Sequence, residues 1–283
     1  MPRVSPAIPR WLVAAVLLCA GASVESTSVA AELDYPLAVA SGSDGPIYLA
    51  DRNLPGVWQI VDGKLSLFFT GSKQFRTPLN AVRCLALDTQ GKLLAGDSAT
   101  REVYRFDDER KPVPLTKGGI GIPMSIGVLK SGELVVADLE LHVLWKVPAA
   151  GGAPVKLTAV PAPRGLAIDT QDRIWVVSHG ADQVVRVRED GSLETVVKGR
   201  PFQFPHQIVV DDQGVAFVSD GYAKAVWKIT EGSEPQQLVS GEPLVNPVGL
   251  ARRGAALLVV DPRAKAVFSL DGSGQLTRVP AQP

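Results

Sequence analysis

The stretch "FVSDGYAKAVWKI", residues 217–229, decides the fold of this chain because five more copies of its pattern superpose on it without gaps. In each copy an apolar run ends at one polar residue, and a bulky or branched apolar residue follows seven positions later. The polar positions are Asp51, Asp97, Asp138, Ser178, Asp220 and Asp261, spaced by 46, 41, 40, 42 and 41 residues. A fixed period of about forty residues indicates a repeat architecture.

Each repeat has the pattern of four short antiparallel strands. An inner strand such as "QIVV" (207–210) is followed by the turn sequence "DDQG", and two further apolar runs and a fourth, more polar one come after it. One such sheet cannot bury both of its faces, whereas six sheets arranged radially can. We therefore predict an all-β fold, a six-bladed β-propeller of four-stranded antiparallel blades. The predicted blades span about 34–70, 80–116, 122–158, 163–198, 205–239 and 246–279.

The repeated residues have structural roles in this interpretation. The five aspartates are expected to accept backbone N–H bonds in the turns that follow them, and Ser178 replaces the aspartate in the fourth repeat. The aromatic residues seven positions later are expected to fill the space between adjacent blades. The last strand, "QLTRV" (275–279), belongs to the sixth repeat. The ring should therefore close by side-chain packing between the first and last blades, without a strand exchanged between the termini.

The first thirty residues have the pattern of a signal peptide. Arg3 and Arg10 precede the apolar run "WLVAAVLLCAGA" (11–22), which is too short to span a bilayer, and a small-residue segment follows. Cleavage after Ala30 or Ala31 fits equally well. The sequence therefore predicts an exported protein, periplasmic or secreted, whose mature part (31–283) is the propeller.

Charge and cysteine content exclude several function classes. Residues 31–283 contain 27 basic and 28 acidic residues, so no global charge favours nucleic acid or an anionic membrane. Cys84 is the only cysteine in this part and lies in the apolar run "VRCLAL", which predicts a buried, inert thiol and no internal disulfide. We expect a monomer without a membrane span and without a cofactor.

One position in each repeat is expected to face the central channel. It is the residue just after the proline, or its equivalent, that begins the inner strand, and ligand sites favour such funnels, where several loops converge. Around the ring these positions hold Leu37, Arg83, Met124, Arg164, His206 and Val248.

The repeats resemble NHL repeats, and residues 34–279 as a whole are similar to the NHL and gluconolactonase-like family of propellers. The resemblance implies a metal site in the funnel, since the lactonases hold a divalent cation there with carboxylate and amide oxygens. Here Arg83, Arg164 and His206 stand at those positions, and guanidinium groups would repel a cation. The segment "FPHQIVVDDQGVAFVSDGYAKAVWKI" (204–229) also resembles a blade of the peptidyl-hydroxyglycine amidating lyases, whose three histidines bind zinc.

That zinc site is not reproduced either. Met124 and Val248 occupy the positions of the other zinc ligands, and catalytic zinc normally needs three protein ligands. His142 and His179, the other histidines of this part, occupy different kinds of position. We therefore predict no metal site, and an enzymatic activity of the lactonase or lyase type is not the favoured reading.

The favoured function is binding of an anionic ligand at a basic channel mouth. The loops leading into the inner strands contain seven basic residues against Glu242, and arginine can hold a carboxylate or phosphate with two parallel hydrogen bonds. The partner would be an anionic small molecule, peptide or protein, and not nucleic acid. Two alternatives stay open: the charges merely solvate the loops, or the mouth is a hydrolase or lyase site with His206 as general base. The predicted ligand-binding residues are Arg83, Arg164, His206, Met124, Arg200 and Lys117.

Overall fold

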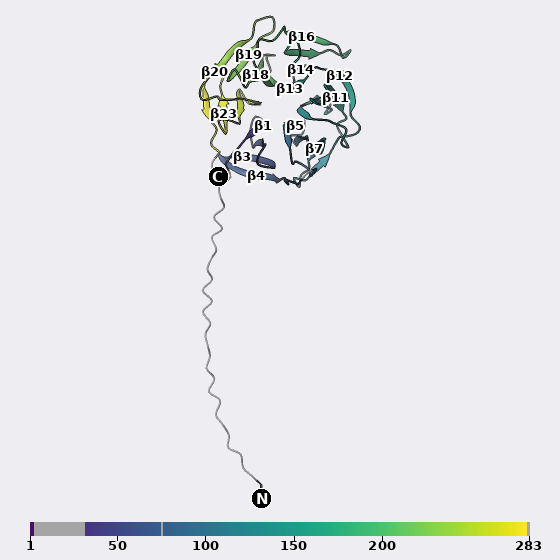
Figure 1. Ribbon diagram of the computed structural model, residues 1–283, viewed down its shortest axis with the longest axis vertical. Helices are drawn as coiled ribbons and strands as arrows, with labels where there is room; N and C mark the ends of the chain where they lie inside the picture. The colour runs from purple at the N-terminus through teal and green to yellow at the C-terminus, as the bar shows by residue number, and fades with distance from the viewer. Residues whose placement is uncertain (3–31, 75, 282–283) are drawn as a thin grey trace. The chain divides into compact units, whose positions relative to one another are not determined.

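The structure, a computed structural model, describes residues 1–2, 32–74 and 76–281. The apolar run and the cleavage site of the predicted signal peptide lie outside the described residues. Residues 36–278 form six four-stranded antiparallel sheets arranged in a ring (Figure 1). The predicted fold class and the predicted number of blades are therefore confirmed. No helix in the described part of the chain is long and apolar enough to cross a membrane.

The strands of each blade follow one another in sequence. Blade 1 contains β1 (Pro36–Ser41), β2 (Ile47–Asp51), β3 (Gly56–Val61) and β4 (Lys64–Thr70). Blade 2 contains β5 (Val82–Leu87), β6 (Leu93–Asp97), β7 (Glu102–Phe106) and β8 (Pro112–Pro114). Blade 3 contains β9 (Pro123–Val128), β10 (Leu134–Asp138), β11 (Val143–Val147) and β12 (Val155–Ala159).

The second half of the ring repeats this order. Blade 4 contains β13 (Pro163–Ile168), β14 (Ile174–Ser178), β15 (Val184–Val187) and β16 (Leu193–Val197). Blade 5 contains β17 (Pro205–Val210), β18 (Ala216–Asp220), β19 (Ala225–Ile229) and β20 (Gln236–Ser240). Blade 6 contains β21 (Gly249–Arg253), β22 (Ala256–Asp261), β23 (Ala266–Leu270) and β24 (Leu276–Arg278).

The repeated aspartates bind two separate backbone segments. Asp220, which is fully buried, accepts an N–H bond from Ala223 in the following turn (3.2 Å), as predicted. It also accepts N–H bonds from Gln203 and Phe204 (both 2.8 Å), which belong to the loop entering the same blade. Ser178 replaces the aspartate as predicted, since its Oγ accepts the Gly180 N–H and donates to the Pro161 carbonyl. The repeated polar residue thus fixes the entering loop as well as the turn.

The hydrophobic core consists of six clusters, each shared by two adjacent blades. The cluster around Trp175, for example, joins residues of blades 4 and 5, and Trp227 packs against it. The other repeated aromatic residues lie in or against the corresponding clusters, which confirms their predicted position between blades. Because every blade depends on both neighbours for burial, the ring must be complete to be stable.

The ring closes without an exchanged strand, as predicted. β1–β4 form the first sheet and β21–β24 form the last one. Leu49 of blade 1 and Val260 of blade 6 share one buried cluster. Two polar contacts also cross this junction: Lys265 Nζ lies 2.7 Å from Asp34 Oδ1, and Arg253 donates to Ser41 Oγ at 2.6 Å.

A β-bulge begins the inner strand in five of the six blades. In blade 2, Val82 pairs with Asp97 and Cys84 pairs with Gly96, so Arg83 between them has no partner. The same irregularity occurs at the start of β1, β9, β13 and β17. Such bulges re-aim a side chain, here toward the channel. They contain Leu37, Arg83, Met124, Arg164 and His206.

Candidate functional site

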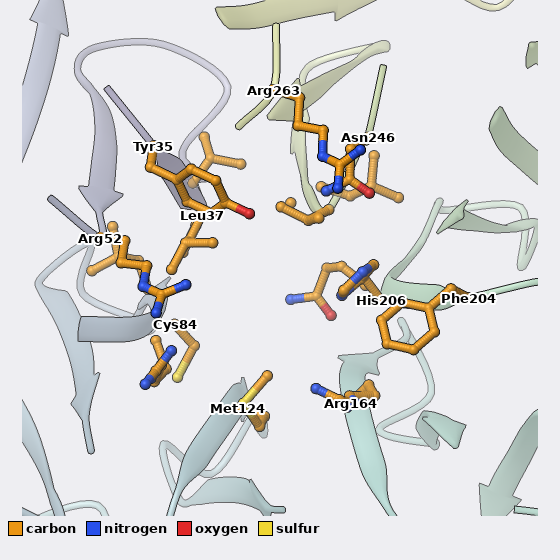
Figure 2. Close-up of a pocket in the computed structure, with 18 of the residues that line it drawn as sticks. Tyr35, Leu37, Arg52, Cys84, Met124, Arg164, Phe204, His206, Asn246 and Arg263 are labelled. Atoms are coloured by element: carbon orange, nitrogen blue, oxygen red, sulfur yellow. The ribbon is translucent and has the colours of Figure 1, made fainter. Parts of the chain in front are cut away.

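A pocket of about 320 Å³ lies at the channel end where the inner strands begin (Figure 2). All six predicted ring positions line it, including Leu37 and Val248 of the first and last blades. Pockets for small molecules have volumes of about 300–1,000 Å³, so this one suits a small molecule or the end of a peptide chain. The alignment of the repeats therefore located the pocket correctly.

Four arginines line this pocket, and none of its lining residues within the described chain is Asp or Glu. Arg83 and Arg164 come from the bulges of blades 2 and 4. Arg52 and Arg263 come from the turns after β2 and β22, and Figure 2 shows both side chains directed toward the same space as Arg164. Sequence reasoning missed these two because it considered only the inner strands and the loops that lead into them.

A signal for Arg52 and Arg263 was nevertheless present in the sequence. The repeated aspartate at the end of the second strand pairs with the proline that begins the inner strand, as Asp51 does with Pro36. The residues just after that aspartate therefore reach the same channel mouth as the ring position. Arg52 follows Asp51 directly, and Arg263 follows Asp261 by two positions.

The four guanidinium groups make few contacts with the protein. Arg83 donates from Nε to Ser98 Oγ at 3.0 Å. Arg52 lies over the ring of Tyr35, with 5.9 Å from Cζ to the ring centroid. Arg164 lies 5.6 Å from the centroid of Phe204, and its Nε is buried without a hydrogen-bond partner among the described residues. No ion pair involves any of these side chains within the described chain.

Burial of these uncompensated charges is unfavourable. It lowers the pKa of Arg83, and the nearby charge of Arg52 lowers it further. Burial also lowers the pKa of Arg164. Arginine remains protonated despite such shifts, so the pocket holds positive charges that a bound anion would neutralise.

His206 lies half-buried beside Phe204, with 4.9 Å between the ring centroids in an edge-to-face arrangement. Its imidazole has no hydrogen bond to another described residue. Burial, and after it the charges of Arg164 and His179, lower its pKa to about 3. The imidazole is therefore neutral at neutral pH. Nε2 of His179 lies 2.8 Å from the carbonyl oxygen of Pro205, the first residue of β17.

The neutrality of His206 predicts a pH dependence of stability. Its folded-state pKa lies below the unfolded value of about 6.5, so the unfolded chain takes up the proton first. Its contribution to stability is fully present above about pH 6.5 and decreases as the pH falls toward the folded pKa. We expect the free energy of unfolding to decrease between pH 6.5 and 4.5, and to decrease less in His206→Gln. Urea titrations at several pH values measure this free energy for both proteins. An equal decrease with pH in the wild-type protein and in His206→Gln would contradict the prediction.

Gln207, which follows His206 in the same bulge, also lines the pocket. Its Oε1 accepts the Leu166 N–H at 3.2 Å, and its Nε2 donates to Ser125 Oγ at 3.2 Å. One side chain of blade 5 thus connects to blades 3 and 4. Gln207 also lines the adjoining part of the channel, together with apolar inner-strand residues such as Ile126 and Ile168.

Two predicted ligand-binding residues do not line this pocket. Arg200 is exposed and donates to the carbonyls of His179 and Gly180, both at 2.6 Å. Lys117 is exposed in the loop after β8. Both residues add positive charge around the mouth without being placed for direct contact.

Metal and thiol chemistry have little support in the pocket. No group of three or more His, Cys, Asp or Glu side chains that could hold a metal ion occurs within the described residues. Cys84 lines the pocket, but burial raises the pKa of its thiol to about 12. Its Sγ lies 3.4 Å from the Pro123 carbonyl oxygen. The thiol is thus buried and unreactive, in agreement with the sequence prediction.

Comparison with known proteins supports the fold. No family model and no curated protein matches the sequence. A virginiamycin B lyase from Staphylococcus aureus is 15% identical, with 90% of this chain and 88% of that chain covered and a TM-score of 0.67. A gluconolactonase from Xanthomonas campestris is 15% identical, with 87% of each chain covered and a TM-score of 0.71. A nidogen/laminin complex gives 14% identity, coverage of 86% and 90%, and a TM-score of 0.67.

At such low identities the likeness establishes the fold alone. The resemblance to gluconolactonase-like propellers is therefore confirmed as a structural one. Since the similar structures include two enzymes and a complex of a different kind, the fold does not select a function. The residues of the pocket must do so.

Proposed function

We propose that this protein is a binding protein for an anionic ligand, which it holds in the pocket at the channel mouth. The single observation that carries this proposal is the composition of the pocket: its described lining residues include four arginines and no carboxylate. A structural arginine is normally paired, as Arg186 is with Glu194 and Glu231. The unpaired Arg164 has no such structural explanation. A carboxylate or phosphate would supply the missing acceptors.

The volume of the pocket favours a small molecule, or the acidic end of a peptide, over a folded domain. We place this binding protein outside the cytoplasm, as a periplasmic or secreted monomer, on the basis of the signal-peptide pattern of residues 1–30. The charged rim, which includes Lys117 and Arg200, would raise the rate at which an anion finds the pocket.

The alternative, a hydrolase or lyase acting at the same mouth, has weaker support. One similar structure is a histidine-to-alanine variant of virginiamycin B lyase that is catalytically inactive, so a histidine is essential in that enzyme. In this chain His206 would be the candidate base. Its lowered pKa makes it a poor proton acceptor at neutral pH, and no carboxylate of the pocket can orient it or act as a second acid.

A thermal-shift screen tests the proposal. The panel contains carboxylates, sugar acids, sugar phosphates and acidic peptides, each with an uncharged analogue of similar size. At a concentration of 100 times Kd a ligand stabilises the folded state by about 2.7 kcal/mol, which corresponds to a Tm increase of about 5–10 °C for a domain of this size. We expect such an increase for at least one anion, and a smaller one at high salt.

The uncharged analogues serve as the control for this screen. The proposal would be contradicted if an uncharged analogue stabilised the protein as strongly as its anion does. It would also be contradicted if no member of the panel stabilised the protein. Mass spectrometry of each mixture after incubation separates binding from turnover, because a chemically changed ligand would support the enzymatic alternative instead.

A further inference from the structure

The positive charges of the pocket lie on two opposed sides of the channel. Adjacent blades 6, 1 and 2 contribute Arg263, Arg52 and Arg83. Blade 4, which lies opposite blade 1 in a six-bladed ring, contributes Arg164. Figure 2 shows Arg52 and Arg164 across the pocket from each other. The closeness of Arg52 and Arg83 is reflected in the lowered pKa of Arg83, to which Arg52 contributes after burial.

The pocket between these two sides is lined by both apolar and polar side chains. Leu37, Met124 and Val248 line it from blades 1, 3 and 6, and His206 and Asn246 line it from β17 and the loop before β21. The polar groups of Gln207 are occupied by hydrogen bonds to Ser125 and Leu166. A ligand lying across the pocket would therefore meet arginine donors at its two ends.

The two sides also differ in their surroundings. Arg164 lies against Phe204, which is stacked on Tyr222 with 4.6 Å between ring centroids. This arrangement restricts the guanidinium and leaves it able to bind one anionic group. The other side has Arg52 and Arg83 close together, whereas Figure 2 shows Arg263 beside Asn246. Two anionic groups, one on each side, would use both sets of donors.

We propose that the ligand is a small dianion whose two anionic groups are separated by a short chain, with one group bound by Arg52 and Arg83 and the other by Arg164. This inference rests on the proposed anion-binding function and specifies its ligand class. Linear dicarboxylates are the simplest molecules of this class. They serve as probes, and other dianions of the same shape would be recognised by the same contacts.

Isothermal titration calorimetry with paired probes tests the inference. Adipate carries two carboxylates on a six-carbon chain, and hexanoate carries one on a chain of the same length. We expect adipate to bind about tenfold more tightly or better, since it makes one more charge-assisted contact. A series from succinate to suberate should show an affinity maximum at one chain length, because only one length fits both sides.

Two variants locate the two ends. Arg83→Gln and Arg164→Gln should each reduce the affinity for adipate to about that of hexanoate, a loss of about tenfold. Arg188→Gln is the control, because Arg188 is exposed in the turn between β15 and β16 and does not line the pocket. It should leave adipate binding unchanged. Circular dichroism verifies that each variant is folded.

The possible results separate this inference from the proposed function. Equal affinity of the wild-type protein for adipate and hexanoate would overturn the dianion inference alone and leave anion binding intact. Loss of adipate binding in only one of the two pocket variants would likewise overturn it. If no probe and no anion of the thermal-shift panel binds, the proposed function fails as well. The wild-type comparison decides the matter even if a variant does not fold.

Discussion

Replacing Asp138 by alanine is expected to destabilise the protein by about 4 kcal/mol or more. The carboxylate is fully buried and accepts five hydrogen bonds. Its donors are the backbone N–H groups of Gly121, Ile122, Glu140 and Leu141 and the indole of Trp145. Alanine would leave these donors without an acceptor where no water replaces it. For a domain of about 250 residues we expect Tm to fall by about 8–16 °C.

Asp190→Ala is the matched control for this prediction. Asp190 is exposed and accepts one backbone N–H bond, from Ser192 at 2.9 Å. Its replacement should cost less than about 1 kcal/mol. Differential scanning calorimetry on both variants compares them directly. Similar melting temperatures for the two would mean that the repeated aspartates do not hold the entering loops in place.

Replacing Arg164 by methionine is expected to change stability and binding in opposite directions. Methionine keeps an unbranched side chain against Phe204 and removes a charge that forms no ion pair with any described residue. The ligand-free protein should therefore become more stable by about 1 kcal/mol, a Tm increase of about 2–4 °C. The best anion of the screen should bind about tenfold more weakly or worse.

The same substitution at Arg186 provides the control. Arg186 is also buried, but its guanidinium is paired with Glu194 at 3.0 Å and Glu231 at 2.7 Å and lies over the ring of Trp175. Arg186→Met should therefore lower Tm and leave anion binding unchanged. Thermal melts and calorimetry measure both effects. A lower Tm for Arg164→Met, with unchanged anion affinity, would show that Arg164 is structural.

The repeat in the sequence was sufficient to predict the fold because each blade carries the same local signals. The aspartate marks the second turn, the aromatic residue marks the interface, and the proline marks the start of the inner strand. Each of these is a short-range feature, so six copies could be aligned without any three-dimensional information. The ring positions followed from the same alignment, including His206 and Arg164.

The remaining properties of the site depend on contacts that no alignment of repeats contains. Arg52 and Arg83 lie close together at the channel mouth although they belong to different blades. Arg52 follows β2, and Arg83 lies in the bulge at the start of β5. His206 is neutral because burial and the nearby charge of Arg164 lower its pKa. The ordinary pKa of a histidine side chain does not predict this shift. The guanidinium of Arg200 donates hydrogen bonds to the carbonyls of His179 and Gly180, and Arg200 does not line the pocket. These are tertiary effects, and only the folded chain reveals them.

The bulges at the start of the inner strands have a consequence for the evolution of such proteins. Arg83 has no partner in the ladder between β5 and β6, so a substitution there changes no strand pairing. Selection can therefore alter the residues that face the ligand while the sheets keep the pairs that hold them together. In this chain, two of the five bulges contain arginines of the pocket, Arg83 and Arg164.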